Sequence, residues 1–211
     1  MKRVINLDNW NRKEHFKFFS ALDDPFWGIT TTVDLTNVYQ KIKNMEVSFF
    51  LYSVYFLLKC INATTAFKLR IENGEVVEYD KINISPTIGR EDGTFGFGFF
   101  EYDTDLSLFI ENAEKEIHRV KNSAGLSFSK DTARADVIRY SALPWFAFSE
   151  MKHAGSIQTG DSIPKISTGK LIQEKKKLLL PISISVHHGL VDGRNVAEFI
   201  QNLKDGQNNT L

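Results

Sequence analysis

The sequence of 211 residues has little that would indicate a metal centre or a disulfide-stabilised protein. Cys60 is its one cysteine, so no internal disulfide can form, and a secreted disulfide scaffold is excluded. There are only five histidines, and no cluster of cysteines and histidines is present to bind structural zinc. We therefore expect no metal site and a location in the reducing cytoplasm.

A surplus of charge of either sign and long apolar runs are also missing. The 26 Lys and Arg residues balance 26 Asp and Glu residues, which argues against a nucleic-acid-binding protein with a basic face. The most apolar stretch, residues 47–58, is shorter than the roughly 20 residues that cross a bilayer. The basic residues near the N-terminus are not followed by the apolar run of a signal peptide. We therefore expect neither a nucleic-acid partner nor a membrane partner.

Phenylalanine is over-represented, with 17 residues, which indicates a bulky core, an aromatic-lined pocket, or both. The length fits one large domain, which we place at residues 1–206, followed by a polar, frayed tail at 207–211. Short strands mixed with helices of unequal length favour an α/β domain with a mixed sheet. The predicted helices are residues 9–19, 36–43, 47–61, 105–120 and 194–203. The predicted strands are residues 27–35, 66–71, 75–79, 95–101, 133–140, 163–169 and 178–187.

The most regular of these strands leads into a pair of histidines, His187 and His188, followed by Asp192 and Gly193. An imidazole titrates near neutral pH and is suited to general-base catalysis. A purely structural role at the end of a strand is the alternative interpretation. Metal binding by the pair is less favoured, because adjacent side chains of a strand point to opposite faces. If Asp192 turns back into the protein, it needs a cation or hydrogen-bond donors.

Four stretches resemble the chloramphenicol acetyltransferases of type A. Residues 187–193 match the H-H-x-x-x-D-G signature, which also occurs in dihydrolipoyl acyltransferase cores and peptide-synthetase condensation domains. Three further stretches favour the first family: N-W-N-R-K-E-H-F at residues 9–16, S-A-L-P-W at 141–145 and L-L-L-P at 178–181. They are similar to the family's N-W-x-R-x-E-H-F, S-A-x-P-W and L-L-P. The resemblance spans about residues 6–205, nearly the whole chain.

The resemblance implies a single-domain two-layer α/β sandwich with a mixed sheet and an acetyl-CoA-dependent O-acetyltransferase. Acetyl-CoA would be a co-substrate, with no permanently bound cofactor. His188 corresponds to the general base, and Ser141 to the hydroxyl that stabilises the oxyanion. Asp192 and Arg12 correspond to an ion pair that supports the loop of His188. Family members are homotrimers with active sites between subunits, so a homotrimer is expected here.

The expected substrate sites depart most from the family pattern. Phe19 stands where a tyrosine is common, and His153 lies near a family leucine, within a segment, residues 151–162, that is more polar than expected. The expected acceptor-binding residues are Phe19, Trp27 and Phe95, and the expected CoA-binding residues are Ser167 and Lys170. The acceptor is a small molecule, with chloramphenicol as the first hypothesis.

Two alternatives to acetyl transfer to chloramphenicol remain open. The first is the same chemistry on another small hydroxylated acceptor. The second is a CoA-binding oligomer without catalysis, which the presence of both His188 and Ser141 disfavours. A dihydrolipoyl acyltransferase core is also disfavoured. Such chains usually carry a lipoyl domain and a subunit-binding domain before the core, whereas here the matching motif starts at Asn9.

Overall fold

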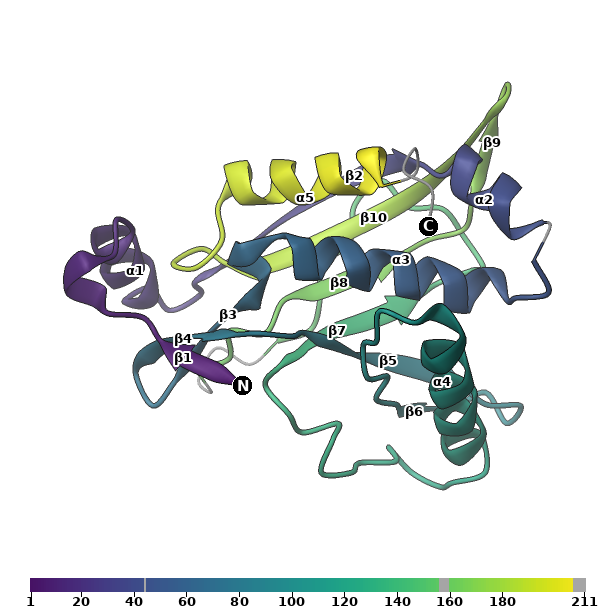
Figure 1. The fold of residues 1–211 in the computed structure, drawn as a ribbon, viewed down its shortest axis with the longest axis horizontal. Helices are drawn as coiled ribbons and strands as arrows, with labels where there is room; N and C mark the ends of the chain where they lie inside the picture. The colour runs from purple at the N-terminus through teal and green to yellow at the C-terminus, as the bar shows by residue number, and fades with distance from the viewer. Residues whose placement is uncertain (44, 156–159, 207–211) are drawn as a thin grey trace.

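A mixed seven-stranded sheet forms the centre of the computed structural model, which describes residues 1–43, 45–155 and 160–206 (Figure 1). The strands run in the order β2-β10-β8-β7-β5-β6, and β9 pairs with the far end of β10. Only β5, β7 and β8 are parallel neighbours, and the other pairs are antiparallel. The strands are β2 (Phe26–Asp34), β5 (Asn83–Gly89), β6 (Phe95–Phe97), β7 (Val137–Ala142), β8 (Lys165–Thr168), β9 (Ile172–Glu174) and β10 (Lys177–His187).

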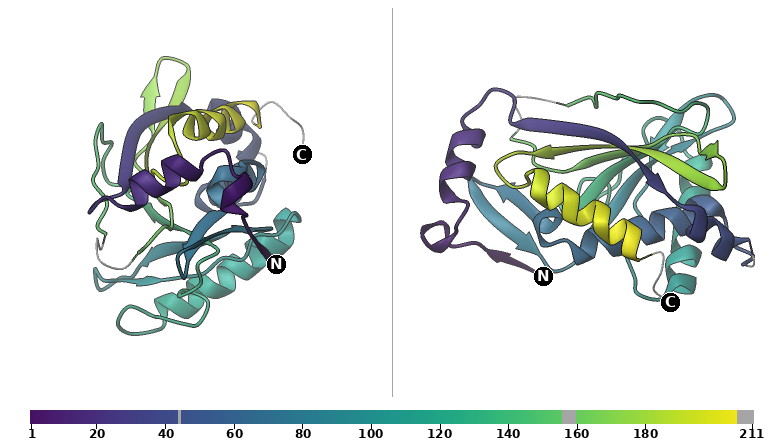
Figure 2. Two further views of the ribbon diagram at one scale, coloured as in Figure 1. Left: turned by 90° about the vertical axis from the view of Figure 1, so that its left-hand side faces the viewer. Right: turned by 90° about the horizontal axis from the view of Figure 1, so that it is seen from above.

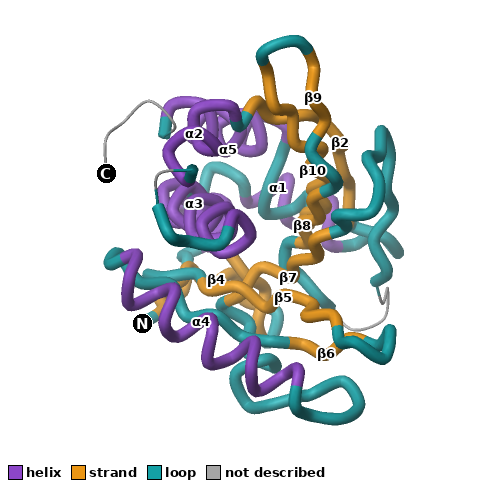
Figure 3. Tube along the Cα trace, turned by 90° about the vertical axis from the view of Figure 1, so that its right-hand side faces the viewer, coloured by secondary structure: helices purple, strands orange, loops and turns teal. Residues whose placement is uncertain are grey.

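Helices cover one face of this sheet. Helices α2 (Thr36–Ile42), α3 (Phe49–Ala63) and α5 (Gly193–Asp205) lie together on that face, and a long loop runs over the opposite face (Figure 3). Ile182, Ile184 and Val186 of β10 are fully buried against the helices. The alternating Ser183 and Ser185 point to the loop side. Helix α4 (Leu106–Lys121) packs beside β5 and β6 through Phe109, Ala113 and Val120.

A smaller three-stranded sheet, β1-β4-β3, lies beside the large one. Its strands are β1 (Lys2–Val4), β3 (Leu69–Glu72) and β4 (Glu75–Tyr79), and a 3₁₀ turn, η2 (Thr65–Lys68), precedes β3. Arg70 of β3 is completely buried, and its guanidinium donates to the carbonyls of Phe67, Leu69, Ala135 and Val137. Burial lowers the pKa of Arg70 to about 10, so the group stays charged at neutral pH. These carbonyls satisfy the buried cation and join the small sheet to the start of β7.

The N-terminal elements lie near the end of β10. A 3₁₀ turn, η1 (Leu7–Asn9), precedes α1 (Lys13–Ser20), and α1 leads into β2. Figure 2 shows α1 at one end of the molecule, with α2 and α4 at the other. This arrangement brings Arg12 and Phe19 next to the histidine pair, although they are about 170 residues apart in the sequence.

The predicted fold class is confirmed, but several predicted elements were wrong in detail. Strands β1, β5 and β9 were not predicted, and the predicted strand at 95–101 ends at Phe97. The predicted strand at 66–71 begins as a 3₁₀ turn, and the predicted helix at 9–19 begins at Lys13. The predicted frayed tail at 207–211 lies outside the described residues.

Candidate active site

The two histidines of the pair have different environments. His187 is the last residue of β10 and is 3% exposed, with its ring against Phe26 at a centroid distance of 5.8 Å. The backbone N–H of Gly189 donates to Nδ1 of His187 at 3.2 Å. Burial lowers the pKa of His187 to about 4, so this imidazole is neutral at physiological pH. His187 therefore has the properties of a structural histidine.

His188 lies just beyond the strand and is partly exposed. Its ring stacks on Phe19 at 3.7 Å with an interplanar angle of 9°, and Trp27 lies 5.5 Å away. The backbone of His188 is held on both sides, because its N–H donates to Pro25 at 2.8 Å and its carbonyl accepts from Arg12 at 3.3 Å. Its Nδ1 is buried and has no partner among the described residues, so Nε2 is the nitrogen that could contact a bound molecule.

Arg12 and Asp192 form an ion pair beneath His188. The two carboxylate oxygens of Asp192 have different hydrogen-bond partners. Oδ2 accepts from Arg12, and Oδ1 accepts from the N–H groups of Arg194 (3.0 Å) and Asn195 (3.2 Å) at the start of α5. Burial acts to raise the pKa of Asp192, but the hydrogen bonds from Arg12 and Asn195 outweigh it and lower the pKa. One carboxylate therefore connects the His188 loop, the start of α5 and the residue that precedes α1.

Ser141 lies on β7, on the face of the sheet opposite to the helices. Its neighbour Tyr140 points into the core and bonds to Thr168, so Ser141 points the other way. The hydroxyl of Ser141 is 3.0 Å from the hydroxyl of Thr87 on β5. Ser167 of β8 is the register partner of Ser141, is 1% exposed and bonds to Nε2 of His153 at 3.0 Å.

A cavity of about 890 Å³ lies on this same face of the sheet, between the strands and the loop that carries His153. Trp27 and His187 line it at one end. Lys165 is buried in its wall, 3.6 Å from the carboxylate of Asp161 and 4.5 Å from the ring centre of Phe26. Burial, followed by the charge of Lys165, lowers the pKa of His153. The segment predicted to be polar contributes Met151, Lys152, His153, Gly155, Gly160 and Asp161 to the lining, while 156–159 lie outside the described residues.

The structure does not bring Ser141 and His188 together within one chain. They are separated by two strand spacings, about 10 Å, and by five residues along β10, about 17 Å, so they lie roughly 20 Å apart. Trp27 and Phe95 are also far apart, because β2 and β6 are the outer strands in the β2-β10-β8-β7-β5-β6 order. The predicted site residues thus form two groups: His188, Phe19 and Trp27 at one end, and Ser141 and Phe95 toward the opposite edge.

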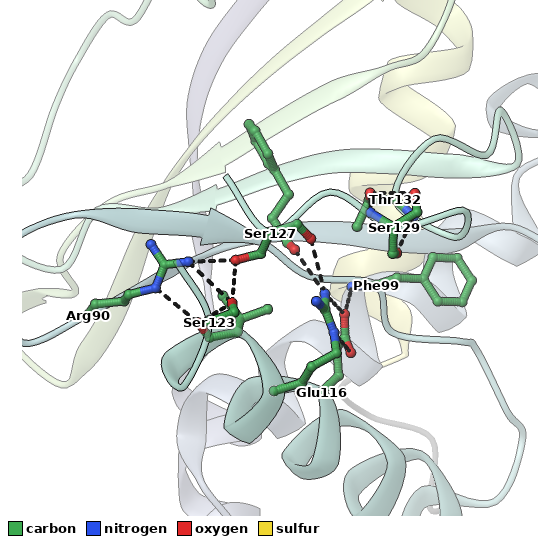
Figure 4. A network of polar contacts seen from close by, with 10 residues as sticks. Arg90, Phe99, Glu116, Ser123, Ser127, Ser129 and Thr132 are labelled. Carbon is green, nitrogen blue, oxygen red and sulfur yellow. Dashed lines mark hydrogen bonds and ion pairs between the residues drawn. The ribbon is translucent and has the colours of Figure 1, made fainter. Parts of the chain in front are cut away.

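Phe95 belongs to an exposed aromatic cluster on β6. It is 47% exposed and contacts Phe97 at 5.7 Å, and Phe97 stacks with the more exposed Phe128 at 5.4 Å. A polar network holds the loop that carries Phe128 (Figure 4). In it, Arg90 donates to the hydroxyl of Ser127 at 2.5 Å and to the carbonyl of Val120 at 2.9 Å. Ser127 has the left-handed backbone conformation (φ 57°), which this network stabilises.

The two predicted CoA-binding residues also differ in position. Lys170 is exposed, and its backbone N–H donates to Phe146 at 2.9 Å. Ser167, by contrast, is buried, and its hydroxyl bonds to His153 on the same face of the sheet as its register partner Ser141. Among the described residues, no group of three or more His, Cys, Asp or Glu side chains is arranged to hold a metal ion. None of the helices described is long and apolar enough to cross a membrane.

The family model described as "Chloramphenicol acetyltransferase" matches residues 2–204. The chain belongs to this family. Chloramphenicol acetyltransferase 3 of Escherichia coli is 28% identical over 98% of this chain and 97% of its own length. The chloramphenicol acetyltransferase of Staphylococcus aureus is 29% identical over 98% of this chain and 97% of its own. The family predicted from the four motifs is therefore confirmed.

Solved structures agree with this assignment. A chloramphenicol acetyltransferase matches with a TM-score of 0.89 at 30% identity, covering 97% of this chain and 99% of its own. The dihydrolipoamide acetyltransferase of Azotobacter vinelandii has a TM-score of 0.67 at 14% identity, covering 92% and 85%. The second likeness, at 14% identity, shows a shared fold.

Three residues that contact the predicted site residues, belong to the exposed aromatic cluster on β6 or line the cavity were not picked out from the sequence. Thr87 was missed because β5 was not predicted, and no local pattern shows that it meets Ser141. Lys165 is a buried lysine in a strand, which only the fold reveals. Phe128 carries a weak signal, since it is the one aromatic residue within the mostly polar residues 121–136.

Proposed function

We propose that this protein transfers the acetyl group of acetyl-CoA to a hydroxyl of chloramphenicol or of a closely related small acceptor. Membership of the chloramphenicol acetyltransferase family supports this reaction. The observation that carries the proposal is the setting of His188. Its ring stacks on Phe19, its backbone is held by Pro25 and Arg12, and its buried Nδ1 leaves Nε2 for the acceptor.

In the proposed reaction, Nε2 of His188 accepts the proton of the acceptor hydroxyl as that oxygen attacks the thioester carbonyl carbon. The C–O bond forms, and the carbonyl oxygen becomes the oxyanion of a tetrahedral intermediate. The hydroxyl of Ser141 donates to this oxyanion, a role that can be worth about 3 kcal/mol. The C–S bond then breaks, and the CoA sulfur takes the proton from the His188 imidazolium. No acyl-enzyme is formed.

We propose that the complete site lies between two subunits of a homotrimer. The separation of roughly 20 Å between Ser141 and His188 in one chain supports this arrangement, because both must reach the same thioester. His188 would come from one subunit and Ser141, with Phe95, from its neighbour. Acetyl-CoA as co-substrate also supports a cytoplasmic location, and Lys170 is the proposed contact for a CoA phosphate.

The chemistry is tested with His188→Ala and Ser141→Ala, each assayed by thiol release from acetyl-CoA in the presence of chloramphenicol. We expect His188→Ala to lower kcat by at least about 10²–10⁴-fold with acetyl-CoA binding retained. His118→Ala, on the exposed surface of α4, is the matched control and should be fully active. A His188→Ala variant with normal kcat would refute the role of the base.

The shared site is tested by co-expressing the His188→Ala and Ser141→Ala chains, with different tags. Mixed trimers contain some interfaces in which the neighbouring His188 and Ser141 are both intact. We expect those trimers to regain activity that neither variant shows alone. Inactive mixed trimers, shown to contain both chains, would contradict a site divided between subunits.

A different small hydroxylated acceptor is the second candidate for this same chemistry. The polar lining contributed by His153 and Lys165 favours it, because an apolar substituent gains little against such side chains. Steady-state kinetics across a panel of hydroxylated aromatic compounds distinguishes the two candidates. A panel member with a kcat/KM above that of chloramphenicol would identify the better acceptor class.

A further inference from the structure

Hydroxyl side chains form a row across the loop-facing side of the large sheet. Ser141 of β7 is the register partner of Ser167 on β8, Ser167 is the partner of Ser183 on β10, and Ser183 is the partner of Thr30 on β2. Thr87 extends this row onto β5, because it follows Pro86, the register partner of Tyr140. Five neighbouring strands therefore each present a hydroxyl at the same level.

The two hydroxyls on either side of Ser141, those of Ser167 and Thr87, have different hydrogen-bond partners. Ser167 bonds to Nε2 of His153 at 3.0 Å, so its hydroxyl is engaged away from Ser141. The hydroxyl of Thr87, by contrast, lies 3.0 Å from the hydroxyl of Ser141 and forms a hydrogen bond with it. Thr87 is therefore the neighbour that determines how the Ser141 hydroxyl is oriented.

A hydroxyl has one proton to donate and two lone pairs to accept with. Between Thr87 and Ser141, one hydroxyl donates and the other accepts. If Ser141 gives its proton to an oxyanion, it cannot also donate to Thr87, so Thr87 must be the donor. Donation by Thr87 also polarises the O–H bond of Ser141 and strengthens its bond to the oxyanion. The proposed reaction therefore requires hydrogen bonds in one direction, from Thr87 to Ser141 and from Ser141 to the oxyanion.

We propose that Thr87 is a positioning residue for catalysis: its hydroxyl donates to Ser141 and directs the Ser141 proton at the oxyanion. The proposal rests on the role of Ser141 in the proposed function. Two features of the fold suit Thr87 to this task. The parallel pairing of β5 with β7 fixes the relative height of the two residues, and a β-branched side chain in a strand has few accessible rotamers.

The test compares Thr87→Val, Thr87→Ser and Thr87→Ala in the full-length oligomeric protein. Valine keeps the shape and strand preference of threonine but cannot donate, whereas serine keeps the donor. We expect Thr87→Val and Thr87→Ala to lower kcat by about 3- to 10-fold, as for the loss of one hydrogen bond, with little change in either KM. Thr87→Ser should retain most of the wild-type kcat. Thermal melts are recorded for each variant.

The Ser141→Ala background separates this proposal from the role of Ser141. In that background Thr87→Val should have no further effect on kcat, because the hydroxyl it would orient is gone. A loss of kcat with Ser141→Ala but not with Thr87→Val or Thr87→Ala would overturn the positioning role alone. Full activity of Ser141→Ala would overturn the proposed function of Ser141. A rise in the acceptor KM with unchanged kcat in Thr87→Val would show that Thr87 contacts the acceptor instead.

Discussion

Substitution of Asp192 separates two contributions that its carboxylate makes to stability. Oδ1 caps α5 through the N–H groups of Arg194 and Asn195, and Oδ2 pairs with Arg12. Asparagine is as good an N-cap as aspartate, so Asp192→Asn keeps the cap and removes the ion pair. Asp192→Ala removes both. The difference between the two variants therefore measures the cap.

The expected magnitudes follow from the exposure of the pair. Breaking a buried pair from one side costs about 3–5 kcal/mol, whereas an exposed pair is worth about 0–1 kcal/mol. The Arg12 side chain is 17% exposed and that of Asp192 is 33% exposed, so solvent screens part of the interaction. We expect Asp192→Asn to cost about 1–2 kcal/mol. Loss of the cap in Asp192→Ala should add about 1 kcal/mol.

The assay is urea denaturation at fixed protein concentration, with Asp192→Asn, Asp192→Ala, Arg12→Met and the double variant Asp192→Asn/Arg12→Met. The double variant should lose less than the sum of the single losses, because the second substitution breaks a pair that is already broken. Asp205→Asn, at the opposite end of α5, is the control and should cost nothing, since a carboxylate there opposes the helix dipole. Equal stability of Asp192→Asn and Asp192→Ala would refute the division between the two oxygens, and strict additivity would refute the ion pair.

Three further predictions concern acidity, the Phe128 loop and the acceptor. Because the folded-state pKa of His187 is lowered to about 4, the unfolded chain binds a proton that the folded chain does not, and stability should fall as the pH drops from about 6.5 towards 4. His187→Asn should flatten that slope in urea melts compared with His118→Asn, and an unchanged slope would contradict the buried neutral imidazole. Arg90→Met should cost about 1–2 kcal/mol and speed amide exchange in residues 123–128, and unchanged exchange there would contradict its role in holding the loop. Because Phe19 lacks the hydroxyl of the tyrosine common at this position, chloramphenicol should be acetylated with a KM above that of family members with the tyrosine. Phe19→Tyr should lower this KM by roughly two- to tenfold. A low-micromolar KM in the unmodified protein would contradict the effect expected from the missing hydroxyl.

Elements with a regular pattern of apolar residues could be predicted from the sequence. Helix α4 repeats its apolar residues at helical spacing, and β10 alternates apolar residues with serines. Strand β5 has no such pattern, because nearly all its side chains are buried and it contains Pro86, which argues against a central strand. In the structure the carbonyl of Pro86 accepts a hydrogen bond from the N–H of Gly98, just beyond β6, at 2.9 Å.

In the candidate site, too, some residues could be predicted from the sequence and others could not. His188, Arg12 and Asp192 belong to motifs that are recognisable from their residues alone. The contact between Thr87 and Ser141 depends on the register of two strands separated by 54 residues, which no local pattern encodes. Likewise, the sequence does not show that His187, and not His188, is the buried member of the pair. That distinction follows from the end of β10 and from a contact distant in the sequence: His187 is the last residue of the strand and packs against Phe26, whereas His188 lies beyond the strand.

The loop-facing side of the sheet is polar although much of it is buried, and this has an energetic consequence. A hydroxyl removed from water costs free energy unless it is hydrogen-bonded. Ser141, Ser167 and Ser183 each have a partner, in Thr87, His153 and the carbonyl of Met151. Those partners come from β5 and from the loop, so the polar face is satisfied only while both stay in place. Alanine or valine at these positions would need no partners, as at the apolar positions Ile138, Ile166 and Ile184 on the helix-facing side. Of these hydroxyls, the proposed reaction uses that of Ser141 directly and that of Thr87 through its contact with Ser141.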